Sequence, residues 1–210
     1  MISYTYILLP EIFLSIAILS LLMLGVFVKN SYNLITKLSL LVLLVLALII
    51  FNGEQTSSAV YEDSFIRNSF TNFIKILILL SSAFILNLSQ LFIKENNLSK
   101  FEYPIIILLA ILGIFFMISA NDLILFYLGL ELQSLSLYIL ASIDRDNIKS
   151  SEAGIKYFIL SALSSGLLLY GCSLLYGFTG TTNFTVIANQ LNSQNTGAVF
   201  AVVFILVGLA

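Results

Sequence analysis

The sequence has few charged residues and almost none of the side chains that cofactors need. Its 210 residues include no histidine, no tryptophan, one cysteine and two prolines, and only 10% are charged. Without histidine and with Cys172 alone, the chain cannot supply a haem histidine, ligate an iron–sulfur cluster or build a zinc site by itself. It also has no glycine-rich phosphate loop after a strand, so we expect no nucleotide site and no cofactor on this chain.

Apolar residues take the place of the missing polar ones. They make up 60% of the chain, whereas soluble domains have about 45–50% apolar and about 25% charged residues. A net charge of −2 and the lack of a basic run argue against nucleic acid as a partner. We therefore predict a polytopic membrane protein.

Seven apolar segments are long enough, or nearly long enough, to be membrane-spanning helices. They predict one all-α transmembrane helix bundle over residues 1–210, with spans at about 10–28, 34–51, 73–93, 104–120, 123–143 and 152–178 and an incomplete one at 197–210. A crossing needs about 20 residues, and the seventh segment has only about 14 before Ala210.

The distribution of Lys and Arg predicts the orientation, because cytoplasmic-side loops collect basic residues. With alternating spans, six lie on the side of the Lys94–Tyr103 and Asp144–Ser151 loops, and two, Arg67 and Lys75, lie on the other side. The N-terminus is thus expected on the outer side. The 17 Phe and 10 Tyr beside no His or Trp hint at an AT-rich organellar gene. We therefore predict the mitochondrial inner membrane, with the N-terminus in the intermembrane space, or the plasma membrane of a bacterium.

The fifth segment, NDLILFYLGLELQSLSLYILAS, is the most informative, because a single ionisable residue, Glu131, lies near its middle. Inserting a comparable Asp at that depth costs roughly 2.5–3.5 kcal/mol, and such residues mostly face other helices or water-filled cavities. Gly129 leaves room for close helix approach, and Gln133 and Ser134 extend the polar face. Glu131 is either a buried structural residue or a group that takes up and releases protons, and its depth favours the second role.

Lys156 is the second charge inside an apolar segment, about one turn into the sixth. A lysine near a helix end can extend to the membrane interface. However, its helix is rich in small residues, which indicates tight packing against other helices: Ala153, Gly154, Ser161, Ala162, Ser164, Ser165 and Gly166. By helical rise, Glu131 lies roughly 18 Å, and Lys156 roughly 6 Å, from the inner end of its own helix. We therefore expect no direct salt bridge between them, and a connection through water or a third residue.

Two long segments resemble a known family. FEYPIIILLAILGIFFMISANDLILFYLGLELQSLSLYILAS and EAGIKYFILSALSSGLLLYGCSLLYGFTGTT, with the opening LLPEIFL, are similar to the chain 2 family of NADH:ubiquinone oxidoreductase, called subunit N in bacterial respiratory complex I. The run LGLELQSLSLY is the most specific part, since looser antiporter-like relatives share the glutamate but usually not the Gln-Ser-Leu run. The resemblance covers nearly the whole chain.

The resemblance implies an antiporter-like, proton-translocating subunit of the complex I membrane arm. Such a subunit helps couple electron transfer from NADH to ubiquinone, on other subunits, to proton pumping. The family's fifth-helix glutamate and sixth-helix lysine, which gate proton transfer, correspond to Glu131 and Lys156. The implied partners are the other membrane-arm subunits and the lipid bilayer, and no flavin, iron–sulfur cluster or nucleotide is implied on this chain.

The sequence departs from the family in one respect. Family members have about twice as many helices, and a lysine in their broken seventh helix partners the glutamate. This sequence reaches Ala210 before that position, so we expect a fragment or a split subunit that a second polypeptide continues after Ala210. Two alternatives stay open: a subunit of a multisubunit cation/proton antiporter, and a structural membrane-arm fragment without its own proton path.

Overall fold

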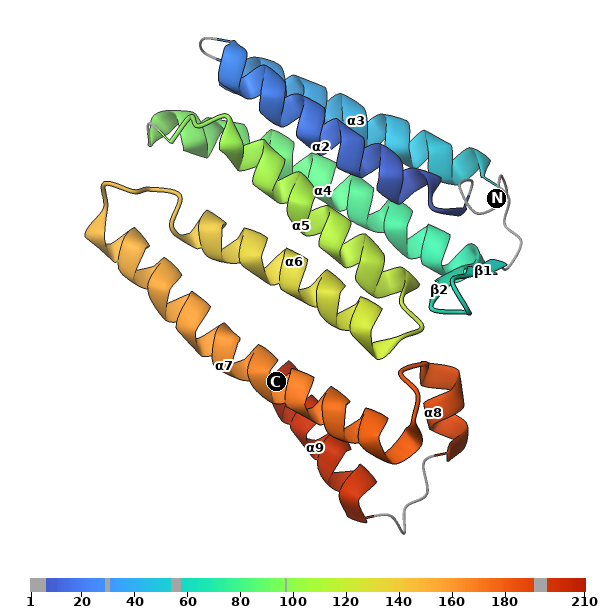
Figure 1. The fold of residues 1–210 in the computed structure, drawn as a ribbon. Coiled ribbons are helices and arrows are strands. Elements are labelled where there is room, and N and C mark those ends of the chain that lie inside the picture. Colours follow the sequence, from blue (N-terminus) through green and yellow to red (C-terminus); the bar gives the residue numbers. More distant parts are fainter. Residues whose placement is uncertain (1–6, 29–30, 54–57, 97, 191–195) are drawn as a thin grey trace.

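The computed structural model describes residues 7–28, 31–53, 58–96, 98–190 and 196–210. These residues form eight helices and one antiparallel hairpin (Figure 1). The elements in chain order are α2 (Leu9–Phe27), α3 (Tyr32–Asn52), β1 (Ser58–Val60), β2 (Phe65–Arg67), α4 (Ser69–Glu95), α5 (Glu102–Ser119), α6 (Leu123–Ala141), α7 (Ile148–Thr179), α8 (Phe184–Gln190) and α9 (Thr196–Leu209). Six helices, α2 to α7, are long and apolar enough to cross a membrane, and α9 is shorter. The predicted all-α transmembrane bundle is confirmed.

Local sequence signals fix where the helices begin and end. Pro10 lies in the first turn of α2, where a missing N–H costs nothing. Asn68 and Thr71 form a capping box at the start of α4, and the Asp122 carboxylate accepts hydrogen bonds from the first backbone N–H groups of α6. Such caps satisfy N–H groups that have no partner within the helix. The C-terminal end of α7 is capped by Gly180, which adopts a left-handed conformation (φ 69°).

Hydrogen bonds between connecting segments show which helix ends lie together. At one end, the Lys100 ammonium donates to the carbonyl of Ile143 at 2.9 Å, which joins the α4–α5 and α6–α7 connections. At the opposite end, the turn before α6 is joined to the α7–α8 connection, since Leu123 N donates to the Thr182 carbonyl at 2.9 Å. Successive long helices are therefore antiparallel. Below, the end with Lys100 is called the inner end, following the orientation predicted from the basic residues.

The polar connections contain more regular structure than the sequence pattern predicts. The stretch 52–72, expected as a loop, includes the β1–β2 hairpin and the first turn of α4. Its turn holds Tyr61, Glu62 and Asp63 at positive φ, and Phe65 behind it is buried. The expected loop 180–194 likewise includes α8. Strands of three residues and a helix of seven are too short to give a clear periodicity.

The helices pack around two apolar clusters. The larger cluster joins α2, α3, α4 and α5 through fully or nearly buried side chains: Leu14, Ile18, Leu21, Ile35, Leu43, Leu46, Ile50, Leu79, Leu86, Ile105, Leu108, Ile111, Leu112 and Phe115. The smaller one joins the start of α6 to α7, α8 and α9 and includes Leu123, Leu168, Cys172, Leu175, Ile187 and Ala201. Cys172 is therefore a packing residue of this cluster. Helix α6 lies between the two groups of helices (Figure 1).

Candidate functional site

Two glycines hold α6 against α5 close to the candidate glutamate. A Cβ atom added to Gly129 would lie 2.8 Å from the carbonyl oxygen of Gly113 and 2.9 Å from the backbone nitrogen of Met117. A Cβ added to Gly113 would lie 2.6 Å from the backbone nitrogen of Gln133. The two backbones are thus in contact, and any side chain at either position would push them apart. The predicted role of Gly129 in close helix approach is confirmed, and it fixes α6 two residues before Glu131.

Glu131 is half-buried on α6. Its Oε1 atom is buried and has no hydrogen-bond partner among the described residues. One turn earlier on α6, the Tyr127 hydroxyl interacts with Glu131 and with Ser165 of α7. A buried carboxylate oxygen needs a hydrogen-bond donor, so this site is built to receive a proton, a water molecule or a cation.

Lys156 lies apart from Glu131. Its ammonium is 2.5 Å from the carboxylate of Glu152, one turn earlier on α7, and the two side chains are 69% and 55% exposed. The structure thus does not bring the two predicted site residues together, in agreement with the expectation of no direct salt bridge. Their roles in proton transfer stay predictions.

The sequence interpretation missed a second charged site, at the outer end of the bundle. The Lys75 ammonium of α4 is 2.5 Å from Oε1 of Glu11 on α2, and both side chains are only 2% exposed. The rings of Phe65 and Phe115 lie 5.3 and 5.4 Å from the same nitrogen. This pair ties α2 to α4 inside the apolar core. Opposite charges near the outer ends of two apolar segments are the available signal, but the pattern of a single helix does not show that they pair.

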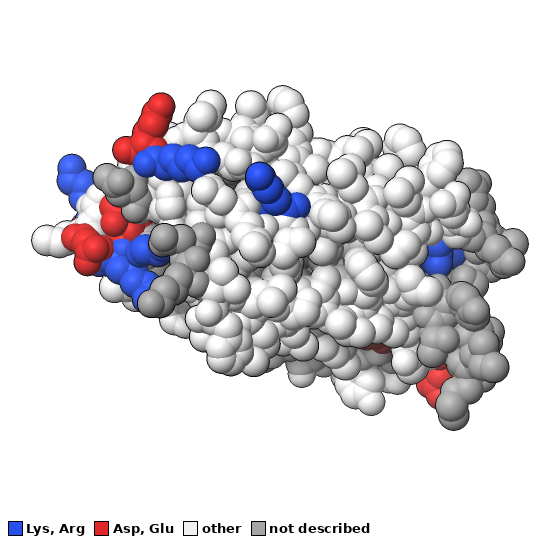
Figure 2. Space-filling model, turned by 90° about the horizontal axis from the view of Figure 1, so that it is seen from above, with Lys and Arg blue, Asp and Glu red and all other residues white. Residues whose placement is uncertain are grey.

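The buried pair also changes the charge count behind the orientation. Lys75 and Arg67, the two basic residues assigned to the outer side, are 1% and 7% exposed. Figure 2 shows charged side chains gathered mainly at one end of the molecule, with a broad uncharged surface beside them. The exposed charged residues at the inner end of the bundle include Lys94, Glu95, Arg145, Asp146 and Lys149. The exposed basic residues are therefore distributed between the two sides of the bundle even more unequally than the six-to-two count in the sequence indicates.

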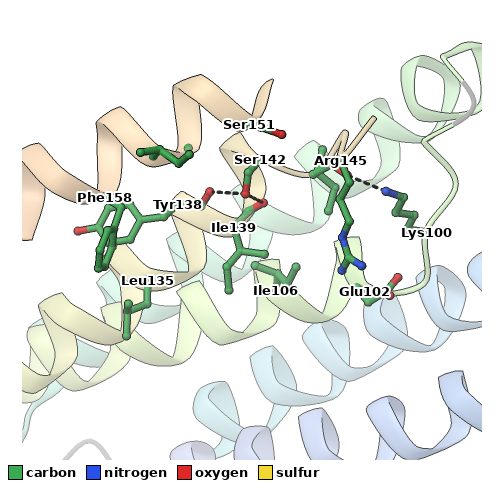
Figure 3. Close-up of a pocket in the computed structure, with 13 residues that line it drawn as sticks. Lys100, Glu102, Ile106, Leu135, Tyr138, Ile139, Ser142, Arg145, Ser151 and Phe158 are labelled. Atoms are coloured by element: carbon green, nitrogen blue, oxygen red, sulfur yellow. Dashed lines mark hydrogen bonds between the residues drawn. The ribbon is translucent and has the colours of Figure 1, made fainter. Parts of the chain in front are cut away.

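A pocket of about 560 Å³ opens at the inner end between α5, α6 and α7. Figure 3 shows Lys100, Glu102 and Arg145 together at one end of it and Tyr138 at the other. The wall between them is mostly apolar and includes Ile106, Leu135, Ile139 and Phe158. At the far end, the Tyr138 hydroxyl donates a hydrogen bond to Oγ of Ser161 on α7. The pocket therefore reaches from the charged inner end to a polar contact between α6 and α7.

No group of three or more Cys, His, Asp or Glu side chains in the described ranges could hold a metal ion. The expectation that this chain carries no cofactor stays a prediction.

Comparison with known proteins identifies the fold and the relatives. The family described as "NADH:quinone oxidoreductase/Mrp antiporter, TM" matches residues 120–210. Over 203 residues the chain is 53% identical to NADH-quinone oxidoreductase subunit N of Pelagibacter ubique, an alignment that covers 96% of this chain. The chain is a homologue of NADH-quinone oxidoreductase subunit N.

Solved structures agree with this homology. A chain of respiratory complex I from Thermus thermophilus superposes with a TM-score of 0.78 at 25% identity, covering 95% of this chain and 43% of that one. A chain of an archaeal membrane-bound sulfane sulfur reductase has the same fold, with a TM-score of 0.77 at 21% identity over 100% of this chain and 44% of its own. The chain spans 43% of the length of the Pelagibacter subunit N.

Proposed function

We propose that the chain acts as a proton-translocating membrane-arm subunit of an NADH:quinone oxidoreductase, with Glu131 as the group that takes up and releases the proton. One observation carries the proposal: Glu131 lies mid-helix in α6, half-buried, with a buried Oε1 that lacks a partner among the described residues. Carboxylates at membrane depth that face other helices mark ion or proton pathways. Electron transfer would take place on other subunits.

Homology favours this function over that of a cation/proton antiporter subunit, because the alignment with subunit N extends over 203 residues at 53% identity. The partners we propose are the other membrane-arm subunits of such a complex. The second polypeptide expected after Ala210 stays a prediction. So does the mitochondrial inner membrane, beside the bacterial plasma membrane that the bacterial relatives favour. The membrane arrangement itself is multi-pass.

Lys156 is the second residue that we assign to the proton path. Its ion pair with Glu152 lies on the exposed face of α7 at the inner end, where one partner can exchange for another when a neighbouring side chain or water approaches. An exposed pair of this kind contributes about 0.3–0.5 kcal/mol, so it does not hold Lys156 in one state.

The test is proton pumping into membrane vesicles that contain the assembled complex, normalised to the amount of complex. Glu131→Gln removes the titratable group at nearly constant shape, and we expect pumping to fall while assembly is kept. Glu131→Asp should restore part of the pumping. Glu95→Gln, an exposed carboxylate at the inner end of α4, is the matched control and should pump normally. Normal pumping in Glu131→Gln would refute the proposal and leave a structural role for the chain.

A further inference from the structure

Two polar residues of α6 that line the inner-end pocket, Tyr138 and Ser142, lie on the same face of the helix as Glu131. Tyr138 is seven residues after Glu131 and Ser142 four residues later, and seven residues correspond to two helical turns. Tyr138 and Ser142 both line the pocket. Along the helix axis, Tyr138 lies about 10 Å from Glu131. The polar lining that α6 gives the pocket therefore ends two turns below the candidate glutamate, on the same side of α6.

The Tyr138 side chain is directed along this line. Side chains of an α-helix lean toward its N-terminus, and α6 begins at the outer end, so the Tyr138 ring leans away from the pocket mouth and toward the level of Glu131. Figure 3 shows the ring at the end of the pocket opposite Lys100 and Arg145. Edge-on contacts with Tyr157 and Phe158, at ring-centre distances of 4.9 and 5.8 Å, hold it there.

Hydroxyl groups of α7 continue from Tyr138 toward Glu131. The Tyr138 hydroxyl donates to Ser161. Ser165 follows one turn later on the same face of α7, about 6 Å along the axis, and it interacts with Tyr127, which in turn interacts with Glu131. Two O–H···O bonds of about 2.7–2.8 Å each add up to nearly this rise, so the route proposed below includes one water molecule between the two serines.

We propose that the pocket between α5, α6 and α7 is the inner-side entrance for the proton that Glu131 receives, and that Tyr138 and Ser161 relay it. The inference rests on the proposed function and adds the route. Water in the pocket gives a proton to Tyr138 as the Tyr138 hydroxyl passes its own to Ser161, and a proton from the inner aqueous phase restores that water. Ser161 passes one through the bridging water to Ser165 and Tyr127, and the last proton binds the Glu131 carboxylate. Each hydroxyl receives one proton and gives one, so only Glu131 changes its charge.

The first test removes single hydroxyls and measures proton pumping per assembled complex in membrane vesicles. Tyr138→Phe keeps the ring and its aromatic contacts, and Ser161→Ala removes the acceptor. A positioned proton-transfer group contributes roughly 10²–10⁴-fold, and water replaces part of that, so we expect each variant to pump about tenfold more slowly. Tyr157→Phe is the matched control, because it removes the hydroxyl of a neighbouring tyrosine that is 44% exposed. This variant should pump normally.

Two further variants separate a relay from a packing contact. Ser161→Thr keeps a hydroxyl on α7 and should restore most of the pumping lost in Ser161→Ala, whereas a loss caused by packing would persist. The double variant Tyr138→Phe/Ser161→Ala should pump no more slowly than the slower single variant, since both residues serve one route.

Accessibility of the pocket is measured independently of pumping. Ser142→Cys, in a chain with Cys172→Ala, should react with a membrane-impermeant charged thiol reagent added on the inner side and not with the same reagent added outside. Absence of inner-side labelling would overturn the proposal that this pocket is the inner-side entrance for the proton.

The outcomes distinguish this inference from the function on which it rests. Loss of pumping in Glu131→Gln together with normal pumping in Tyr138→Phe and Ser161→Ala would overturn the relay and leave the proposed function intact. Normal pumping in Glu131→Gln would overturn the proposed function. An equal loss in Tyr157→Phe would overturn the relay as well, since that residue donates to neither serine in the proposed route. If Tyr138→Phe prevents assembly, Ser161→Ala and Ser161→Thr decide the question alone.

Discussion

The buried Glu11–Lys75 pair should make the first helix of the bundle depend strongly on one ion pair. The ammonium and the carboxylate lie 2.5 Å apart and both side chains are 2% exposed, so neither charge has water to stabilise it if the other is removed. Removing one partner of a buried pair costs about 3–5 kcal/mol. Replacing Lys75 also removes the contacts of its ammonium with the rings of Phe65 and Phe115, and a desolvated cation–π contact is worth about 2 kcal/mol.

We expect Glu11→Gln to lower the free energy of unfolding by about 3–5 kcal/mol, because it leaves a buried ammonium ion without its counter-charge. Lys75→Met should cost a similar amount. The double variant Glu11→Gln/Lys75→Met leaves no buried charge, and replacing a buried pair by neutral groups is often close to neutral. It should therefore be more stable than either single variant. This non-additivity distinguishes a buried pair from two independent contacts.

The assay is unfolding of the purified chain by increasing SDS in mixed micelles, followed by far-ultraviolet circular dichroism. Glu152→Gln, which breaks the exposed pair on α7, is the control, and its expected cost is about 0.3–0.5 kcal/mol. Single variants at Glu11 or Lys75 that cost less than about 1 kcal/mol, the range of exposed pairs, would refute the reasoning. So would a double variant whose loss equals the sum of the two single losses.

Three further predictions concern the fold and its orientation. Gly129→Leu should prevent close packing of α5 and α6 and lower the yield of folded chain in a membrane-insertion assay. Gly177→Leu is the control and should fold normally, because a Cβ added there meets nothing within 4 Å. Equal yields of the two variants would contradict this prediction. Asp122→Ala removes the cap of α6 and should lower the free energy of unfolding by about 0.5–2 kcal/mol in the SDS assay. An unchanged free energy of unfolding would contradict this prediction. Single cysteines in the 98–103 and 144–151 connections, in a chain lacking Cys172, should be labelled only from the inner side, and labelling of either from outside would reverse the orientation.

The membrane-spanning helices could be predicted because hydropathy alone fixes them. Each expected apolar segment coincides with one helix, and the ends differ by at most four residues: the third span, expected from Phe73, begins at Ser69. The four extra residues of α4 depend on the Asn68–Thr71 capping box, a polar signal that a hydropathy window does not register. The β1–β2 hairpin has positive φ at three successive residues of its turn, and Asn121 donates a hydrogen bond to the carbonyl of Asp63 in that turn. Local sequence indicates neither feature.

The candidate site was predictable only in part. Glu131 stands out in the sequence because a lone carboxylate in a long apolar run has no local explanation. Lys75 does not, because its partner is 64 residues earlier and a lysine near a helix end usually extends to the interface. The Tyr138–Ser161 contact depends on the rotation of α6 and α7 relative to each other, and no single-helix pattern contains that information.

Infrared difference spectroscopy of the assembled complex tests the central claim, proton uptake by Glu131, most directly. The spectrum of the complex during NADH-driven turnover minus that of the resting complex shows the carbonyl bands of carboxylic acids that gain or lose a proton. We predict such a band in the unaltered complex and its disappearance in Glu131→Gln, with the band retained in the Glu95→Gln control. An unchanged carboxylic acid band in Glu131→Gln would contradict the account.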